Sequence, residues 1–167
     1  MNLQDLKRQM PDIFERVKRD VETVIGRHRA GLSLGLVSMG MFYGNFIGGM
    51  FFSGGTMIIM NTDPLHVLLE TQPDEVILAY VYHILLHEYI HSLGFLNERQ
   101  CRQITHQITK EVFKGSKHPA VVLAFKGIGA YFPDLHLIYA PQNYGFQGQW
   151  QVDRVKEFDR ESFRYFG

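Results

Sequence analysis

The N-terminal part of the chain shows the hydrophobic period of an amphipathic helix. Across residues 2–29, apolar side chains recur three or four positions apart, with charged residues between them. This spacing gathers the apolar side chains on one face, so we expect a helix that packs this face against a core. Pro11 is a candidate break, which would divide the helix into a short first piece and a longer second one.

The next part of the chain is apolar and rich in glycine. Residues 31–60 contain no charged side chain, but glycines and polar residues interrupt the run every few positions. No continuous apolar stretch is therefore long enough for a membrane-spanning helix. Short strands are predicted at 32–38, 46–52 and 56–60, and the segment Ser53-Gly54-Gly55 is typical of a hairpin turn between the last two.

Two further helices are predicted in the middle of the chain. After a short helix or turn at 64–70, a long and largely apolar segment at 73–94 begins with a proline and two acids, which favour a helix start. Gly94 is suited to end this helix in a left-handed turn. A second helix is predicted at 97–114, with its own apolar stripe.

The C-terminal pattern is less regular. Segments 121–125 and 135–139 are apolar and predict two strands, or a buried helical turn followed by one strand. Residues 141–150 are rich in glutamine, glycine and aromatic residues, which is typical of an irregular loop. Charged and aromatic residues alternate across 151–166, where a final helix is predicted.

The order of these elements predicts an α+β fold in one domain, residues 1–167. We expect a small, twisted, mostly antiparallel sheet that packs on the N-terminal helix and on the helix at 73–94. Formal net charge is zero, which gives no electrostatic reason to expect nucleic acid as a partner. Cys101 is the only cysteine, so an internal disulfide is excluded. The N-terminus lacks a signal-peptide pattern, and we expect a cytoplasmic protein.

One short segment indicates a chemistry. It is His87-Glu88-Tyr89-Ile90-His91, an H-E-x-x-H sequence within the helix predicted at 73–94. A helix places positions i and i+4 on one face, so both imidazoles can bind one metal ion, with zinc expected. Glu88 would lie beside the ion and take a proton from a bound water, which favours hydrolysis of a peptide bond. The alternative is a buried helix whose two histidines are satisfied by other polar groups.

Residues 87–98 resemble the zincin metallopeptidases, and the order of elements over residues 2–114 resembles a minimal zincin domain. In that family a small twisted sheet precedes the H-E-x-x-H helix, and its edge strand holds the substrate peptide. The resemblance implies that residues 46–60 supply this edge. The metzincin pattern matches only as far as Gly94, because position 97 is asparagine and no methionine follows Met60.

The third metal ligand is left open by the motif. A zinc site of this class has three protein ligands and an open position for water. The gluzincin resemblance implies a carboxylate on the following helix, and we favour Glu98. Glu111 has the separation from His91 typical of thermolysin-like enzymes, yet a straight helix would place it about 20 Å from Glu98. The other candidates are His106, Asn97, Glu111, His118 and His136.

Other residues could complete the site. His83 lies one turn before His87 and is turned about 80° from His91, so we expect a core residue or one that orients a ligand. A peptidase of this kind also needs a group that stabilises the oxyanion. The C-terminal candidates for that role are His136, Tyr139 and Tyr144. Cys101 has no evident base partner and is expected to be structural.

The leading hypothesis is a zinc-dependent peptidase with a peptide or protein substrate. Glu88 is the predicted base, and His87, His91 and Glu98 are the predicted ligands. A second hypothesis is a zincin-like protein that binds metal or peptide with little peptidase activity. A third is a metal-free structural or assembly domain. The apolar, glycine-rich sheet would suit a hydrophobic peptide, a second copy of the chain or a membrane surface.

Overall fold

The chain begins with a long capped helix, α1 (Leu3–Ile25). A computed structural model describes residues 1–115, 117–139 and 150–161 of the protein. The Asn2 side chain accepts a hydrogen bond from the Asp5 N–H, and the Asp5 carboxylate accepts one from the Asn2 N–H. The helix runs through Pro11 without a division. Pro11 is itself buried, so packing of the apolar face outweighs the one backbone hydrogen bond that proline removes.

The main sheet has four strands in the order β3-β4-β1-β6. Its strands are β1 (Ser33–Val37), β3 (Gly49–Phe51), β4 (Met57–Asn61) and β6 (Asp153–Arg154). The pairings β3–β4 and β1–β6 are antiparallel, but the longest pairing, β1–β4, is parallel. Two of the three pairings in this sheet are thus antiparallel, as predicted, but the parallel β1–β4 pairing was not predicted. Because β3 pairs with one edge of β4, β1 can pair only with the other edge. There β1 runs in the same direction as β4.

A second, two-stranded sheet pairs β2 (Asn45–Ile47) with β5 (His136–Ile138) in parallel. The single strand predicted at 46–52 is thus divided into β2 and β3. The division falls at Gly48, whose carbonyl accepts a hydrogen bond from the Asn61 N–H. A Cβ at Gly48 would lie 2.7 Å from Ile84 Cδ1 and 2.8 Å from Leu137 Cδ1, so a side chain at this crossing would require both neighbouring side chains to move.

The remaining described elements are mostly helical. They are α2 (Thr62–Thr71), α3 (Asp74–Ser92), α4 (Glu98–Val112), α5 (Pro119–Lys126) and a 3-10 turn, η1 (Ile128–Ala130). The helices predicted at 73–94 and 97–114 are confirmed. The segment 121–125 is helical and a strand follows it, which confirms the second of the two alternatives. No described helix has the length and apolarity that crossing a membrane requires.

The C-terminal segment differs from its prediction. The described part of the helix predicted at 151–166 forms β6 and then turns, because Val155 and Phe158 are buried and Asp159 is bonded to other elements. The loop predicted at 141–150 lies outside the described residues except for Trp150.

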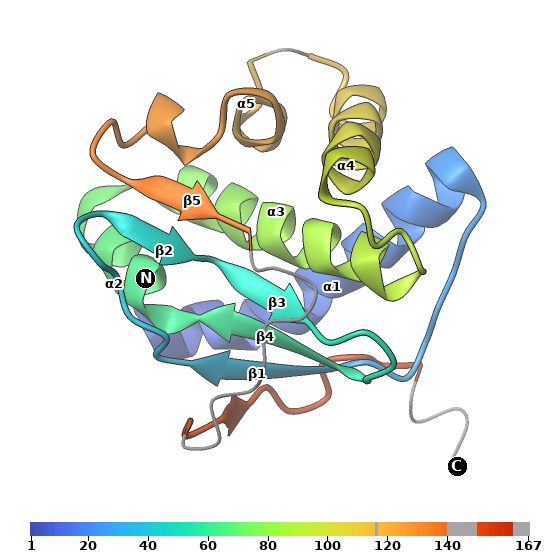
Figure 1. The fold of residues 1–167 in the computed structure, drawn as a ribbon, viewed down its shortest axis with the longest axis horizontal. Helices are drawn as coiled ribbons and strands as arrows, with labels where there is room; N and C mark the ends of the chain where they lie inside the picture. The colour runs from blue at the N-terminus through green and yellow to red at the C-terminus, as the bar shows by residue number, and fades with distance from the viewer. Residues whose placement is uncertain (116, 140–149, 162–167) are drawn as a thin grey trace.

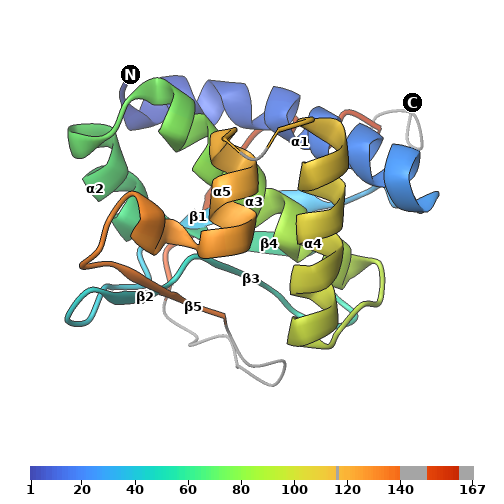
Figure 2. The same ribbon diagram turned by 90° about the horizontal axis from the view of Figure 1, so that it is seen from above.

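Helix α3 occupies the centre of the molecule. It packs against α1, α4, α5 and strand β3, and Figures 1 and 2 show it enclosed by these elements. Every residue from Ala79 to Ser92 is buried. A helix that is buried on all sides must be apolar all round, which matches the long apolar segment of the sequence.

Both faces of the main sheet are covered. Leu34, Leu36 and Ile58 belong to the large core between the sheet and the helices. Residues whose side chains point to the opposite face of the sheet form a smaller cluster. Trp150 and Val152 of the C-terminal segment pack on this cluster. A Cβ at Gly35 would collide with Val152, so this segment lies directly on β1. The chain itself thus covers part of the apolar sheet.

A buried ion pair ties the C-terminal segment to α1. Lys18 is 2% exposed, and its Nζ lies 2.8 Å from the Asp159 carboxylate and 3.0 Å from Glu15. Burial disfavours the charged lysine, but Asp159 and Glu15 outweigh it and raise the pKa of Lys18. Asp159 also accepts hydrogen bonds from the N–H groups of Gly31 and Leu32, at the start of β1.

Replacing Asp159 should destabilise the fold. We expect Asp159→Ala to lower the free energy of unfolding by about 3 kcal/mol, because it leaves a buried lysine without its main partner. Urea denaturation followed by circular dichroism measures the change. Asp12→Ala is the control, since the Asp12–Arg160 pair is exposed and should contribute less than about 1 kcal/mol. Equal losses in the two variants would contradict this role for Asp159.

Candidate metal centre

The H-E-x-x-H residues lie at the C-terminal end of α3 and are all buried. His87, Glu88 and His91 are 1%, 5% and 6% exposed. The two imidazole rings lie on one face of the helix, edge to face, with their centroids 4.8 Å apart. The predicted placement of both histidines on one helix face is therefore confirmed.

A tight turn after α3 brings the predicted third ligand to these histidines. Gly94 has φ 103° and its N–H donates to the His91 carbonyl, which ends the helix. The Asn97 side chain then caps α4 by accepting from the Gln100 N–H. As a result, the first residue of α4, Glu98, points its carboxylate at both rings. The Glu98 oxygens lie 2.5 Å from His91 Nε2 and 3.1 Å from His87 Nε2.

The other nitrogen of each ring is held by a neighbour. His91 Nδ1 lies 2.8 Å from the Phe95 carbonyl oxygen. A carbonyl only accepts, so Nδ1 carries the proton and Nε2 is the nitrogen that can bind a metal. His87 Nδ1 lies 3.6 Å from Cys101 Sγ, and the Cys101 S–H donates to the His87 carbonyl at 3.4 Å. Both Nε2 atoms therefore face Glu98.

Two arrangements could hold a cation here. His87, His91 and Cys101 are buried and offer ligand atoms within 4.8 Å of one another, which is close enough for one metal ion. Glu98 contacts the same histidines from another side. Because Cys101 meets Nδ1 of His87 and Glu98 meets Nε2, the thiol and the carboxylate lie against opposite edges of that ring.

The Glu98 carboxylate itself fits a cation. Within the described part of the chain its Oε2 is buried and has no hydrogen-bond partner, since the 3.1 Å approach to His87 Nε2 lacks hydrogen-bond geometry. A buried carboxylate oxygen without a partner is costly, whereas an oxygen and a ring nitrogen that face each other can share a metal ion.

Electrostatic coupling links these groups. Burial opposes ionisation of Glu98, but hydrogen bonds from His87 and His91 outweigh it and hold the Glu98 pKa well below its usual range. Burial likewise disfavours charge on His91, yet Glu98 and Glu88 raise its pKa. Burial raises the pKa of the Cys101 thiol, which agrees with its role as an S–H donor. The cluster is thus arranged around one anionic carboxylate and two imidazoles.

Glu88 lies where strand β3 meets α3. A Cβ added to Gly49 would lie 3.5 Å from Glu88 Cγ and 2.8 Å from both the Ile59 carbonyl and Ile84. Only a glycine therefore lets β3 approach the helix at this level. Burial raises the pKa of Glu88, and no described residue donates a hydrogen bond to its carboxylate. The outer edge of β3 has no partner strand among the described residues.

Tyr139 covers the ring of His87. The two rings stack at 4.2 Å with an interplanar angle of 22°, and the Tyr139 hydroxyl lies 3.5 Å from His83 Nε2. Burial and the neighbouring His87 lower the pKa of His83 to about 3, so this histidine is neutral. His83 therefore belongs to a buried layer beside the candidate ligands. Of the oxyanion candidates, Tyr139 touches the site, His136 is exposed on β5, and Tyr144 lies outside the described residues.

The other candidate ligands are engaged elsewhere or exposed. Asn97 caps α4, and His106 stacks on Phe125. His118 caps α5, where its Nδ1 accepts from the Ala120 N–H. Glu111 and His136 are exposed. None of these five side chains meets His87 or His91, in contrast to Glu98.

Cys101 is the site residue that the sequence interpretation missed. It was expected to be structural, yet its thiol contacts His87 directly. The available signal was its position three residues after Glu98, because that spacing places two side chains on the same face of a helix.

No protein-family model, curated protein or solved structure matches this chain. What the site can do therefore follows from its own residues and their geometry. The site is a buried cluster beside a strand edge, and it contains two imidazoles, a thiol and two carboxylates. Groups of this kind are able to hold a metal ion and to transfer a proton.

Removing either histidine should abolish metal binding. We expect protein purified without a histidine tag to retain one metal ion per chain, and His87→Ala or His91→Ala to retain none above background. Elemental analysis after dialysis measures the content. His66→Ala is the matched control, because His66 is exposed on α2. Undiminished metal content in both site variants would exclude this centre.

Proposed function

We propose that the protein is a zinc-dependent peptidase in which His87, His91 and Glu98 hold the ion and Glu88 is the general base. The observation that carries the proposal is the convergence of both Nε2 atoms on the Glu98 carboxylate. Two imidazoles and one carboxylate are typical ligands of catalytic zinc, which keeps a further position for water.

Glu98 suits the third position better than Cys101. Zinc binds nitrogen and oxygen ligands at about 2.0–2.2 Å, so ligand atoms around a tetrahedral ion lie about 3.3 Å apart. Glu98 Oε2 lies 3.1 Å from His87 Nε2, which is close to this spacing, whereas the 2.5 Å contact between Glu98 Oε1 and His91 Nε2 would have to lengthen when zinc binds. A metal ion bound by Cys101 would have to use Nδ1 of His87, because the thiol lies on that side of the ring. The ion would then replace the present contacts of the Cys101 thiol with His87. Cys101 is therefore proposed as the residue that orients His87.

Glu88 carries the proton transfers in the proposed reaction. When bound, zinc is a Lewis acid that lowers the pKa of a coordinated water. Glu88 follows His87 in the chain and lies within the same buried cluster, where its carboxylate accepts a proton from the attacking water. The same carboxylate then delivers that proton to the departing amine. Exclusion of bulk water around Glu88, which is 5% exposed, strengthens these interactions.

Strand β3 is proposed to bind the substrate backbone. It is one of the two edge strands of the four-stranded sheet, and Gly49 brings it beside Glu88. An extended peptide can add to such an edge by main-chain hydrogen bonds, which places a carbonyl group next to the helix. Backbone binding of this kind accepts many sequences, so selectivity has to come from side-chain contacts elsewhere.

The identity of the third ligand can be measured directly. We expect Glu98→Gln to weaken zinc binding by at least about a hundredfold, because it removes a charged ligand. Cys101→Ser should weaken zinc binding by about tenfold, the lower end of the effect of residues that orient ligands. Competition with a chromophoric chelator gives both dissociation constants. The opposite ranking would assign the third position to Cys101.

Glu88 can be tested separately from metal binding. We expect Glu88→Gln to lower the rate of peptide cleavage by about 10²–10⁴ while retaining zinc. Mass spectrometry of a peptide library incubated with zinc-loaded protein measures cleavage. Glu111→Gln is the matched control, since Glu111 is exposed on α4. Full activity in Glu88→Gln would refute Glu88 as the general base. If the zinc-loaded wild type cleaves no peptide, the peptidase proposal fails and the alternative of a metal-binding protein without peptidase activity is supported.

A further inference from the structure

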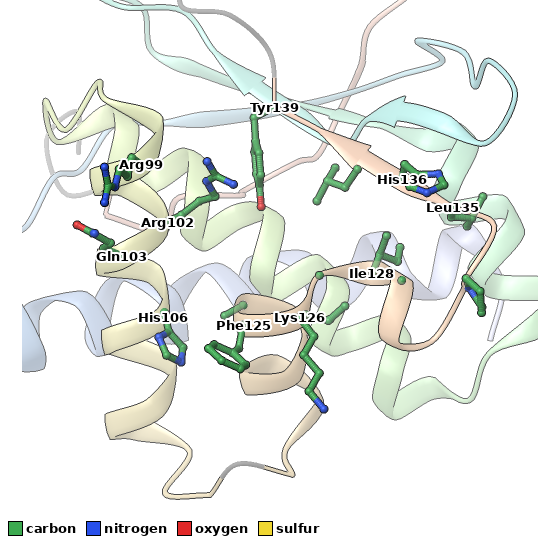
Figure 3. A pocket seen from close by; sticks show the side chains of 16 residues that line it. Arg99, Arg102, Gln103, His106, Phe125, Lys126, Ile128, Leu135, His136 and Tyr139 are labelled. Carbon is green, nitrogen blue, oxygen red and sulfur yellow. The ribbon is translucent and has the colours of Figure 1, made fainter.

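A groove lies between α4, α5 and β5, next to the candidate metal centre. Its volume is about 590 Å³, and Figure 3 shows the side chains that line it. From α4 it receives Arg99, Arg102, Gln103 and His106. These positions are three or four residues apart, so they form one face of α4. Glu98 and Cys101 lie on a different face of the same helix, toward the metal centre.

The groove is positively charged. Arg99, Arg102 and Lys126 line it, and none of its described lining residues is acidic. Within the described residues none of these three cations forms an ion pair with a carboxylate. A second hollow of about 940 Å³ continues from it along α4 and α5, and it shares three lining residues with the first. The second hollow adds the cations Lys110, Lys114 and Lys117. The chain has no net charge, so this positive surface is a local excess.

One aromatic ring separates the groove from the metal centre. The Arg102 guanidinium lies over the Tyr139 ring, 5.5 Å from its centroid, and Figure 3 shows Arg102 pointing toward Tyr139. The imidazole of His87 stacks on that ring at 4.2 Å, so the guanidinium must occupy the opposite face. A peptide held at the metal centre therefore needs only a short extension past Tyr139 to reach Arg102.

The apolar lining of the groove indicates the kind of anion. Leu123, Ile128, Leu135 and Leu137 supply apolar surface from the side of α5 and β5, across from the arginines of α4. A groove with cations on one side and apolar surface on the other is suited to side chains that have an aliphatic stem and a charged end, as glutamate does. A nucleic acid would instead need a long row of phosphate contacts, which a chain of zero net charge supplies poorly.

We propose that this groove binds the carboxylates of an acidic peptide segment, with Arg99 and Arg102 as the main contacts. Arginine pairs with a carboxylate through two parallel hydrogen bonds, which gives both strength and orientation. If the groove sets a substrate preference, this inference rests on the peptidase function proposed above. The groove would then select peptides with acidic residues on one side of the cleaved bond. Both arginines are exposed, so binding should weaken as salt screens the charges.

Binding can be measured without hydrolysis. The probe is a fluorescent peptide that alternates glutamate and alanine, compared with its glutamine counterpart, on zinc-loaded Glu88→Gln protein. Fluorescence anisotropy should give at least about tenfold tighter binding for the glutamate peptide at low salt, and a smaller difference at high salt. Arg99→Glu should weaken binding of the glutamate peptide about tenfold without loss of zinc, because Arg99 contacts no proposed ligand. Arg19→Glu, an exposed arginine on α1, should leave binding unchanged.

The outcomes separate the two proposals. Equal affinity for the glutamate and glutamine peptides, or no effect of Arg99→Glu, would overturn the acidic-peptide groove even if the wild type cleaves peptides. Arg99-dependent binding of the glutamate peptide would support the groove even if the wild type cleaves nothing, and only the peptidase proposal would then fail. A single-stranded oligonucleotide that displaces the glutamate peptide with higher affinity would assign the groove to nucleic acid.

Discussion

The burial of α3 on every side is the constraint on which the rest of the structure depends. A helix in this position stabilises the fold through apolar packing, so a polar side chain on it is costly unless its neighbours supply a partner. His87 and His91 find theirs on α4, and Tyr139 stacks on His87 from the end of β5. Glu88 has the edge of β3 beside it, where the sheet comes close because Gly49 has no side chain.

The short connection between α3 and α4 gives two faces of α4 different surroundings. With only a tight turn at Gly94 between them, the first turns of α4 lie against the histidines, and Glu98 and Cys101 share the face toward them. The helical period then turns Arg99 and Arg102 to the groove. Residues of opposite charge that are neighbours in the sequence thus form an anionic carboxylate beside the histidines on one face of α4 and a cationic surface on another face.

Local signals predicted the central helices, but they predicted neither the long-range strand pairing nor the C-terminal segment. The positions of α3 and α4 follow from a long apolar segment, an apolar stripe, the Asn97 cap and Gly94, all of which depend on neighbours in sequence. The described part of 151–166 forms β6 in place of the predicted helix, because distant elements such as β1 and Lys18 hold it. The parallel pairing of β1 with β4 and the division at Gly48 depend on which distant elements meet, and no nearby residue specifies that. At the site, the i and i+4 spacing placed both histidines correctly. Cys101 was missed because its contact exists only once α4 folds back on α3.

The polar groups left without partners argue for a binding site rather than a closed structural cluster. A self-contained cluster would satisfy its buried oxygens, since each one left unpaired costs about 1–3 kcal/mol. Instead, within the described residues Glu98 Oε2, His83 Nδ1 and the Tyr80 hydroxyl are buried without a hydrogen-bond partner. Tyr80 and His83 precede His87 on α3, and Glu98 meets His87 from α4. The fourth such atom among the described residues, Glu15 Oε1, lies 3.0 Å from Lys18 Nζ. Costs concentrated in this way are typical of sites whose polar groups are completed by a metal ion, water or substrate.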